Sequence, residues 1–337
     1  MEFKDLVFEL CASVGVSGKE TEAVETAKKE LSKLGETKVS PLGNLICSVL
    51  PEKEGRPHLM LDAHIDENGM IVTYIDEKGF LRVGGCGGMD RRLLLSSTVF
   101  VHTEKEVLRG VVFSLPPHLQ SGERKNPKVD EISIDIGFSQ EEAKKRVSLG
   151  DRVTLRSVPQ ILNGDLVSSK SLDDRIGCAA VIKAAELIKK ENPDIGLTVV
   201  LSTMEETGGQ GATTAAYSVN PTHALAVDVS FAHTPDAKIE KCGEFFKGPM
   251  IGFSPILDAR ESKKLVKIAK ENEIPFQIEA MGGRTSTNAD EIAVSRGGVT
   301  TSLLSIPQRY MHTPIETVSI TDAENTAKLI AKYAMSL

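Results

Sequence analysis

The stretch His58-Leu-Met-Leu-Asp-Ala-His-Ile-Asp66 places a mostly apolar run directly before a histidine and an aspartate. A run of this kind predicts a strand over residues 58–63 that is buried on both faces. Strands of this type occur in parallel sheets covered by helices, where functional residues gather at the carboxyl ends of the strands. The stretch therefore predicts an α/β fold and makes His64 and Asp66 candidate functional residues.

Outward from this stretch, strands and helices alternate along most of the chain. Alternation of this kind predicts a mostly parallel, mixed sheet flanked by helices. Further strands are expected at 45–50, 197–204, 224–229, 276–280 and 300–305, and helices at 2–13, 175–190, 261–273 and up to about 334. Residues 1–66 and 164–337 are therefore expected to form one α/β domain.

Three Ser/Thr-x-x-Glu patterns predict helix starts, because each side chain can satisfy a free backbone N–H group at the helix end. They begin at Ser17, Ser139 and Thr321. The first precedes a segment with apolar residues at spacings of three and four, which predicts a helix that stops at Gly35.

Residues 67–163 differ in character from the rest of the chain. Their predicted strands are short and are separated by turn residues, as in the hairpin loop Asp76-Glu-Lys-Gly79. The expected strands are 71–75, 80–83, 99–102, 107–113 and 132–136. This segment is expected to be a small β-rich domain inserted into the α/β domain.

Composition narrows the possible functions. The 337 residues carry a net charge of −7 without a long basic block, so nucleic-acid binding is not expected. The absence of Trp and the 4% aromatic content disfavour a sugar-stacking or base-stacking site. Five scattered cysteines without a Cys-x-x-Cys pair, no apolar run of 18 residues and no signal-peptide pattern favour a cytoplasmic protein without a membrane span.

Polar residues that suit metal binding lie at or after the predicted strand ends: His64, Asp66, Asp173, Asp174, Glu205, Glu206, Asp228 and His312. Each alone has a structural interpretation, such as a helix N-cap for Asp173. Together they are typical of a hydrolytic site with two divalent metal ions. One of two adjacent glutamates can bind metal while the other reaches the attacking water. A carboxylate two residues after a histidine ligand can orient its ring.

Five motifs resemble the tetrahedral (TET) di-metal aminopeptidases, a family with glutamyl, leucyl, lysyl and deblocking members, some of them labelled cellulases or endoglucanases. They are Ala63-His-Ile-Asp-Glu-Asn-Gly69, Ser171-Leu-Asp-Asp-Arg-Ile-Gly177, Met204-Glu-Glu-Thr-Gly208, Ala226-Val-Asp-Val229 and Arg309-Tyr-Met-His-Thr-Pro-Ile-Glu316. The resemblance covers essentially the whole chain. In the insertion, Pro116-Pro-His-Leu119 and Ile134-Asp-Ile-Gly137 are similar to the family's dimerisation domain.

The resemblance implies a role for each site residue. One metal ion is expected at His64, Asp173 and Asp228, and the other at Asp173, Glu206 and His312, with Asp173 bridging. Glu205 would be the general base, and Asp66 would orient His64. The resemblance also implies zinc or cobalt as the metal, short peptide substrates and a homo-oligomer of dimers assembled into a tetrahedral dodecamer.

Other functions are compatible with parts of this pattern. A di-metal carboxypeptidase or N-acyl amino acid deacylase uses a related fold, a glycoside hydrolase is suggested only by the cellulase labels, and a metal-dependent scaffold would need no base. The preferred N-terminal residue is open. Arg260, Arg284 and Lys247 can present positive charge to an acidic substrate or simply lie on the surface, and Cys178 is expected to be a buried core residue.

Overall fold

Strands β3 (His58–His64) and β12 (Gly196–Ser202) lie at the centre of the structure, a computed structural model that describes residues 1–119, 126–235 and 237–337. All seven residues of each strand are buried, and the two strands pair in parallel along their whole length. β13 (His223–Phe231) pairs in parallel with β3, and β16 (Thr300–Arg309) with β13. These four strands confirm the predicted parallel part of the mixed sheet, and β3 confirms the predicted burial on both faces.

Shorter strands extend this set into an eleven-stranded sheet within the described residues, and most of them run antiparallel to a neighbour. The main order is β1-β2-β12-β3-β13-β16-β17-β11-β10, with β14 and β15 attached beside β16. The bounds are β1 (Glu36–Val39), β2 (Leu45–Leu50), β10 (Gln160–Ile161), β11 (Leu166–Ser169), β14 (Met250–Phe253), β15 (Gln277–Ala280) and β17 (Glu316–Ser319).

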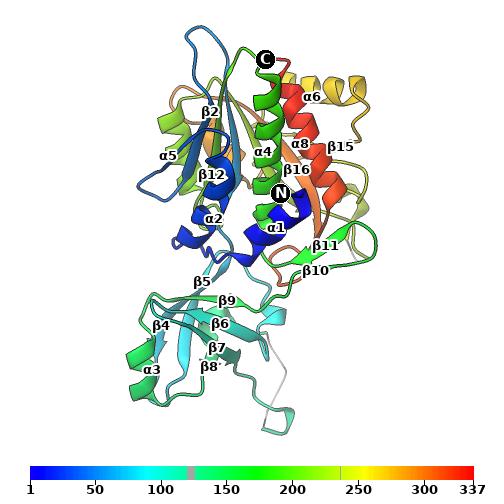
Figure 1. The fold of residues 1–337 in the computed structure, drawn as a ribbon. Helices are drawn as coiled ribbons and strands as arrows, with labels where there is room; N and C mark the ends of the chain where they lie inside the picture. The colour runs from blue at the N-terminus through cyan, green and yellow to red at the C-terminus, as the bar shows by residue number, and fades with distance from the viewer. Residues whose placement is uncertain (120–125, 236) are drawn as a thin grey trace.

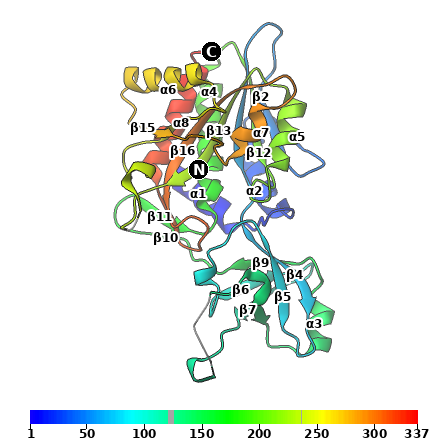
Figure 2. The ribbon, with the colours of Figure 1, turned by 180° about the vertical axis from the view of Figure 1, so that it is seen from behind.

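Helices cover both faces of the sheet because alternate residues of its strands point to opposite sides. On β3, Leu59 and Leu61 join one apolar core with α1, α2, α4, α6 and α8, whereas Met60 joins another with α5 and α7. Figure 1 shows the first face and Figure 2 the opposite one. The bounds are α1 (Phe3–Ala12), α2 (Thr21–Leu31), α4 (Leu172–Glu191), α5 (Gln210–Val219), α6 (Ala259–Glu271), α7 (Asn288–Ala293) and α8 (Ile320–Ala334).

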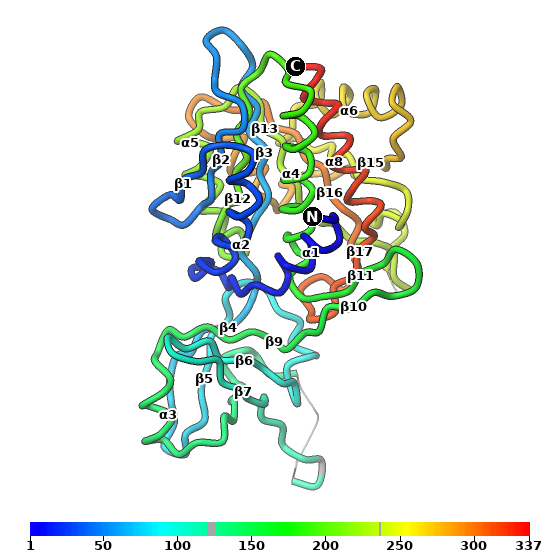
Figure 3. The backbone as a smooth tube through the Cα atoms, in the orientation of Figure 1, coloured from blue at the N-terminus to red at the C-terminus, as the bar shows by residue number. Residues whose placement is uncertain are grey.

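A separate antiparallel β-barrel completes the molecule and confirms the predicted inserted β-rich domain (Figure 3). Its closed strand order is β4-β5-β8-β7-β6-β9, and its interior is filled by apolar side chains such as Val72, Val101 and Ile134. The bounds are β4 (Gly69–Ile75), β5 (Leu81–Cys86), β6 (Thr98–His102), β7 (Val107–Val112), β8 (Ser133–Asp135) and β9 (Arg152–Leu155), with α3 (Gln140–Arg146) beside them. The boundaries at 67 and 163 stay a prediction.

Of the three predicted helix caps, only Ser139 is confirmed, since its hydroxyl accepts the Glu142 N–H group. The cap at Ser17 is wrong: α2 starts at Thr21, and the Ser17 hydroxyl donates to Asp66 instead. The cap at Thr321 is also wrong, because Ser319 caps α8. Among the described residues, no helix has the length and apolar character needed to cross a membrane.

Candidate metal centre

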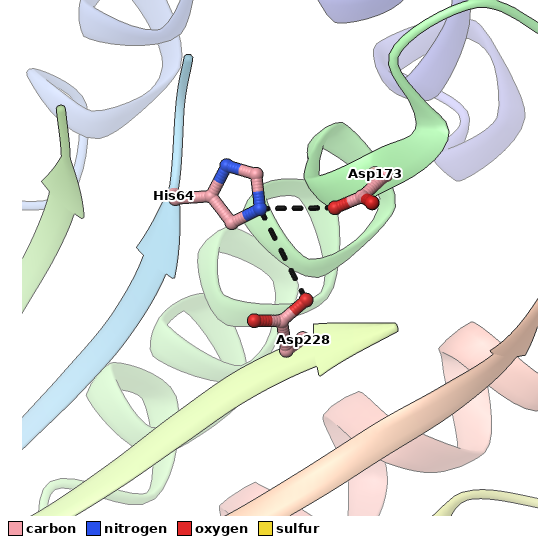
Figure 4. A group of neighbouring side chains, drawn as sticks. All are labelled: His64, Asp173 and Asp228. Carbon is pink, nitrogen blue, oxygen red and sulfur yellow. Dashed lines mark hydrogen bonds and ion pairs between the residues drawn. The ribbon is translucent and has the colours of Figure 1, made fainter. Parts of the chain in front are cut away.

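The carboxyl ends of the parallel strands bring the first group of predicted ligands together (Figure 4). His64 ends β3, Asp228 lies in the neighbouring strand β13, and Asp173 lies at the start of α4. The His64 Nε2 atom is 3.0 Å from Asp173 Oδ1 and 4.0 Å from Asp228 Oδ1. All three side chains are buried, and one ligand atom of each lies within 4.8 Å of the others.

The second group shares Asp173 with the first. The His312 Nε2 atom is 3.2 Å from Asp173 Oδ2 and 3.5 Å from Glu206 Oε1. Asp173 thus turns one carboxylate oxygen toward His64 and the other toward His312. Such an arrangement has the form of a bridging carboxylate between two ion positions.

Burial of so many acidic groups in one place alters their protonation. Burial raises the pKa of Glu206 to about 8, and the negative charge of Asp173 adds to this effect. Burial likewise raises the pKa of Asp228 well above its usual range. Burying several carboxylates without compensating charge is costly, and carboxylate and imidazole ligands are those preferred by divalent ions such as zinc and cobalt. The donor set therefore fits two divalent cations that share Asp173.

Asp66 organises the site through its main chain and its carboxylate. The Nδ1 atom of His64 lies 3.1 Å from the Asp66 main-chain oxygen and 3.5 Å from Asp66 Oδ1. The fully buried carboxylate also accepts the N–H groups of Glu205 over 3.0 Å and Glu206 over 3.2 Å, and the Ser17 hydroxyl. Burial opposes ionisation of Asp66, but the hydrogen bond from His64 and its charge lower the pKa of Asp66 overall.

Glu316 was quoted in the last sequence motif but received no role. Its carboxylate accepts the main-chain N–H of Asp173 over 3.1 Å and that of His312 over 2.9 Å. One buried side chain therefore fixes the backbone of two ligands that are 139 positions apart. The Glu four residues after His312 was the only sequence signal for this contact.

The β-barrel also contributes to the site, which the sequence did not indicate. Gly87 and Gly88 follow β5 and lie against the ligands. A Cβ atom on Gly87 would lie 2.9 Å from Glu206 Oε2, and one on Gly88 would lie 2.9 Å from His312 Nδ1. Gly87 also has a φ of +83°, which favours glycine. Any larger residue here would displace a ligand.

A cavity of about 490 Å³ opens at the metal groups and is lined by Asp173, Glu205, Glu206, Asp228 and His312 among others. The sequence left open whether Arg260, Arg284 and Lys247 face a substrate or lie on the surface, and of these three only Arg284 lines the cavity. The Arg284 guanidinium is paired with Asp290 over 3.1 Å and with Glu291 over 2.5 Å. Arg260 is paired with Asp258 on the surface instead. Cys178 is buried and donates to the His64 main-chain oxygen over 3.1 Å.

Comparison with known proteins places these features in a family. Residues 43–329 match the family described as M42 glutamyl aminopeptidase. The chain is 33% identical over 332 residues to lysyl aminopeptidase from Pyrococcus furiosus, which covers 96% of this chain and 94% of that protein.

Two solved structures share the whole fold. Aminopeptidase APDkam598 from the archaeon Desulfurococcus kamchatkensis has a TM-score of 0.93 and 32% identity, covering 100% of this chain and 95% of that chain. The TET1 peptidase of Pyrococcus horikoshii, which can assemble into a tetrahedron or a large octahedral shell, has a TM-score of 0.87 and 32% identity over 100% of both chains. In sequence and in fold, the chain belongs to the M42 glutamyl aminopeptidase family of peptide hydrolases.

Proposed function

We propose that this aminopeptidase removes N-terminal residues from short peptides with the help of two divalent metal ions. His64, Asp173 and Asp228 would hold one ion, and Asp173, Glu206 and His312 the other. The observation that carries the proposal is the position of Asp173, whose two carboxylate oxygens face different histidines. When bound, ions in such a pair lower the pKa of a water molecule and polarise the peptide carbonyl.

Glu205 is the residue we assign to proton transfer. It lines the cavity beside Glu206 and belongs to neither ligand group. Its carboxylate would take a proton from the attacking water and deliver that proton to the leaving amine. Asp66 holds the Glu205 main chain in place through the 3.0 Å hydrogen bond, which supports a fixed position for this base.

We also propose an assembly and a location. Residues 1–66 and 164–337 would carry catalysis, and residues 67–163 would form the contacts of a dimer that assembles further into a tetrahedral dodecamer. This proposal is supported by the likeness to the TET1 peptidase of Pyrococcus horikoshii. Five free cysteines are compatible with the reducing cytoplasm.

The metal requirement is tested with enzyme that has been stripped by a chelator. Hydrolysis of amino-acid p-nitroanilides should vanish and return when zinc or cobalt is added. An N-acyl amino acid offered in parallel should stay intact, because the free amino group defines the substrate. Hydrolysis of the N-acyl compound instead of the anilides would favour a deacylase.

Replacement of Glu205 tests the base. Glu205→Gln should bind zinc with nearly unchanged stoichiometry, measured by elemental analysis, and lower kcat by about 10²–10⁴-fold. As a comparison, Asp173→Asn should lose metal as well as activity, because both groups share this carboxylate. Normal turnover by Glu205→Gln would remove Glu205 from the mechanism.

A further inference from the structure

We propose that Glu279 makes this enzyme prefer peptides whose N-terminal residue has a long cationic side chain, lysine or arginine. The inference rests on the proposed aminopeptidase function and names the substrate class of the same site. Glu279 lies on β15 and lines the cavity that contains the metal groups. It belongs to neither group of metal ligands.

Two serine hydroxyls hold the Glu279 carboxylate in a fixed position. Ser230 on β13 donates to its Oε1 atom, and Ser305 on β16 donates to its Oε2 atom over 2.7 Å. Both serines are buried. Because the two oxygens are held by neutral donors, the carboxylate is oriented while its charge is left uncompensated.

The strand register places this carboxylate at a suitable distance from the metal groups. Ser305 is the partner of Asp228 in the parallel pairing of β13 and β16, so both side chains lie on the same face. Ser230 lies two residues beyond Asp228 on the same strand, which corresponds to about 6.5 Å along that face. The four-carbon stem of a lysine can span a gap of this order.

The charges around the cavity favour a substrate with a cationic N-terminal side chain. Within the described residues, Glu279 has no Lys, Arg or His partner in an ion pair, whereas the cavity's Arg284 is already bound to Asp290 and Glu291. Two divalent ions would neutralise the ligand carboxylates and Glu205. Glu279 would then be the carboxylate in the cavity that lacks a counter-charge.

Apolar residues in the same cavity suit the stem of such a side chain. Phe231 and Met281 line it, and Phe231 is 57% exposed. Lysine and arginine side chains commonly lay their methylene groups along apolar surface while the charged end reaches a polar partner. An acidic N-terminal side chain would instead meet the like charge of Glu279.

A comparison of isosteric substrates tests the inference with the metal-loaded enzyme. Norleucine has the stem of lysine without its charge, so the ratio of kcat/KM for lysine and norleucine p-nitroanilides isolates the charge. The wild-type ratio should be about tenfold in favour of lysine, the value expected for one partly buried ion pair. Glu279→Gln should bring the ratio near one, chiefly by lowering the lysine value.

Two controls accompany this measurement. Glu271→Gln removes an exposed carboxylate at the end of α6, outside the cavity, and should leave the ratio unchanged. Free L-lysine should inhibit wild-type hydrolysis of leucine p-nitroanilide more strongly than free L-norleucine. This inhibition tests the pocket without any substitution.

The outcomes are distinguishable. Equal kcat/KM values for lysine and norleucine in the wild type, or equal inhibition by the two free amino acids, would overturn the role of Glu279. A uniform loss on all substrates in Glu279→Gln would assign the carboxylate to the α-amino group and also overturn it. Failure of the metal-loaded wild type on every anilide would refute the proposed function itself.

Discussion

Replacement of Ser17 by alanine tests how the N-terminal segment supports the metal centre. The Ser17 side chain is 4% exposed, and its hydroxyl donates to the fully buried carboxylate of Asp66. Besides its contact with the His64 ring, that carboxylate accepts three hydrogen bonds, from Ser17 and from the main chains of Glu205 and Glu206. The substitution removes one of the three without introducing a clash.

The expected cost follows from the charge and burial of Asp66. A hydrogen bond to a buried charged group contributes about 1.5–3 kcal/mol, so Ser17→Ala should lower the free energy of unfolding by about that amount. Because Asp66 also contacts the His64 ring, zinc affinity should fall by about tenfold. Urea unfolding and competition with a zinc-binding dye measure the two quantities.

A helix cap in the β-barrel provides the matched control. Ser139→Ala removes the exposed cap of α3, which should cost about 1 kcal/mol or less and leave zinc affinity unchanged. If Ser17→Ala behaves like Ser139→Ala, with normal zinc affinity, then Ser17 acts only locally. The link from the N-terminal segment to the metal centre would then be refuted.

Gly88→Ala should displace the His312 ring and lower kcat/KM by at least about tenfold, whereas Gly84→Ala, whose Cβ would meet its nearest neighbour at 3.5 Å, should be tolerated. Equal kcat/KM values for the two variants would contradict the close contact between Gly88 and His312. Burial raises the pKa of Glu20 from 4.5 to about 7, so its contribution to stability is fully present below pH 4.5 and is lost as the pH rises through 7. Glu20→Gln should therefore remove part of the loss of stability between pH 5 and 8 in thermal melts; an unchanged profile would argue against this shift.

Much of the fold was predictable because its strongest elements carry local patterns. The apolar run at β3 predicts a strand buried on both faces, and all seven of its residues are buried. By contrast, β10, with two residues, and β14 and β17, with four each, were missed, since segments this short carry little periodicity. Helix α5 was missed because its start is rich in glycine and polar residues.

The predicted ligand residues lie close together in the structure. The contacts that support them from distant segments could not be predicted from the sequence. Ser17 fits a local capping box in the sequence, but in the structure its hydroxyl donates a hydrogen bond to Asp66, which is 49 positions away. The contact of Gly88 with His312 depends on how the barrel packs, and no sequence spacing encodes it. Glu316 belongs to a motif that the sequence shows. Its hydrogen bonds with the main chains of Asp173 and His312 are evident only in the folded structure.

Through Gly87 and Gly88, the segment that forms the barrel also contacts the ligands of the candidate metal centre. The chain leaves the sheet after His64 and Asp66, builds the barrel and passes the ligands again at these glycines before completing it. Excision of the barrel would also remove Gly88 from the lining of the cavity at the candidate metal ligands. The insertion therefore contributes a wall to the cavity at the candidate metal ligands, and a chimera that exchanges the barrel should keep this glycine pair.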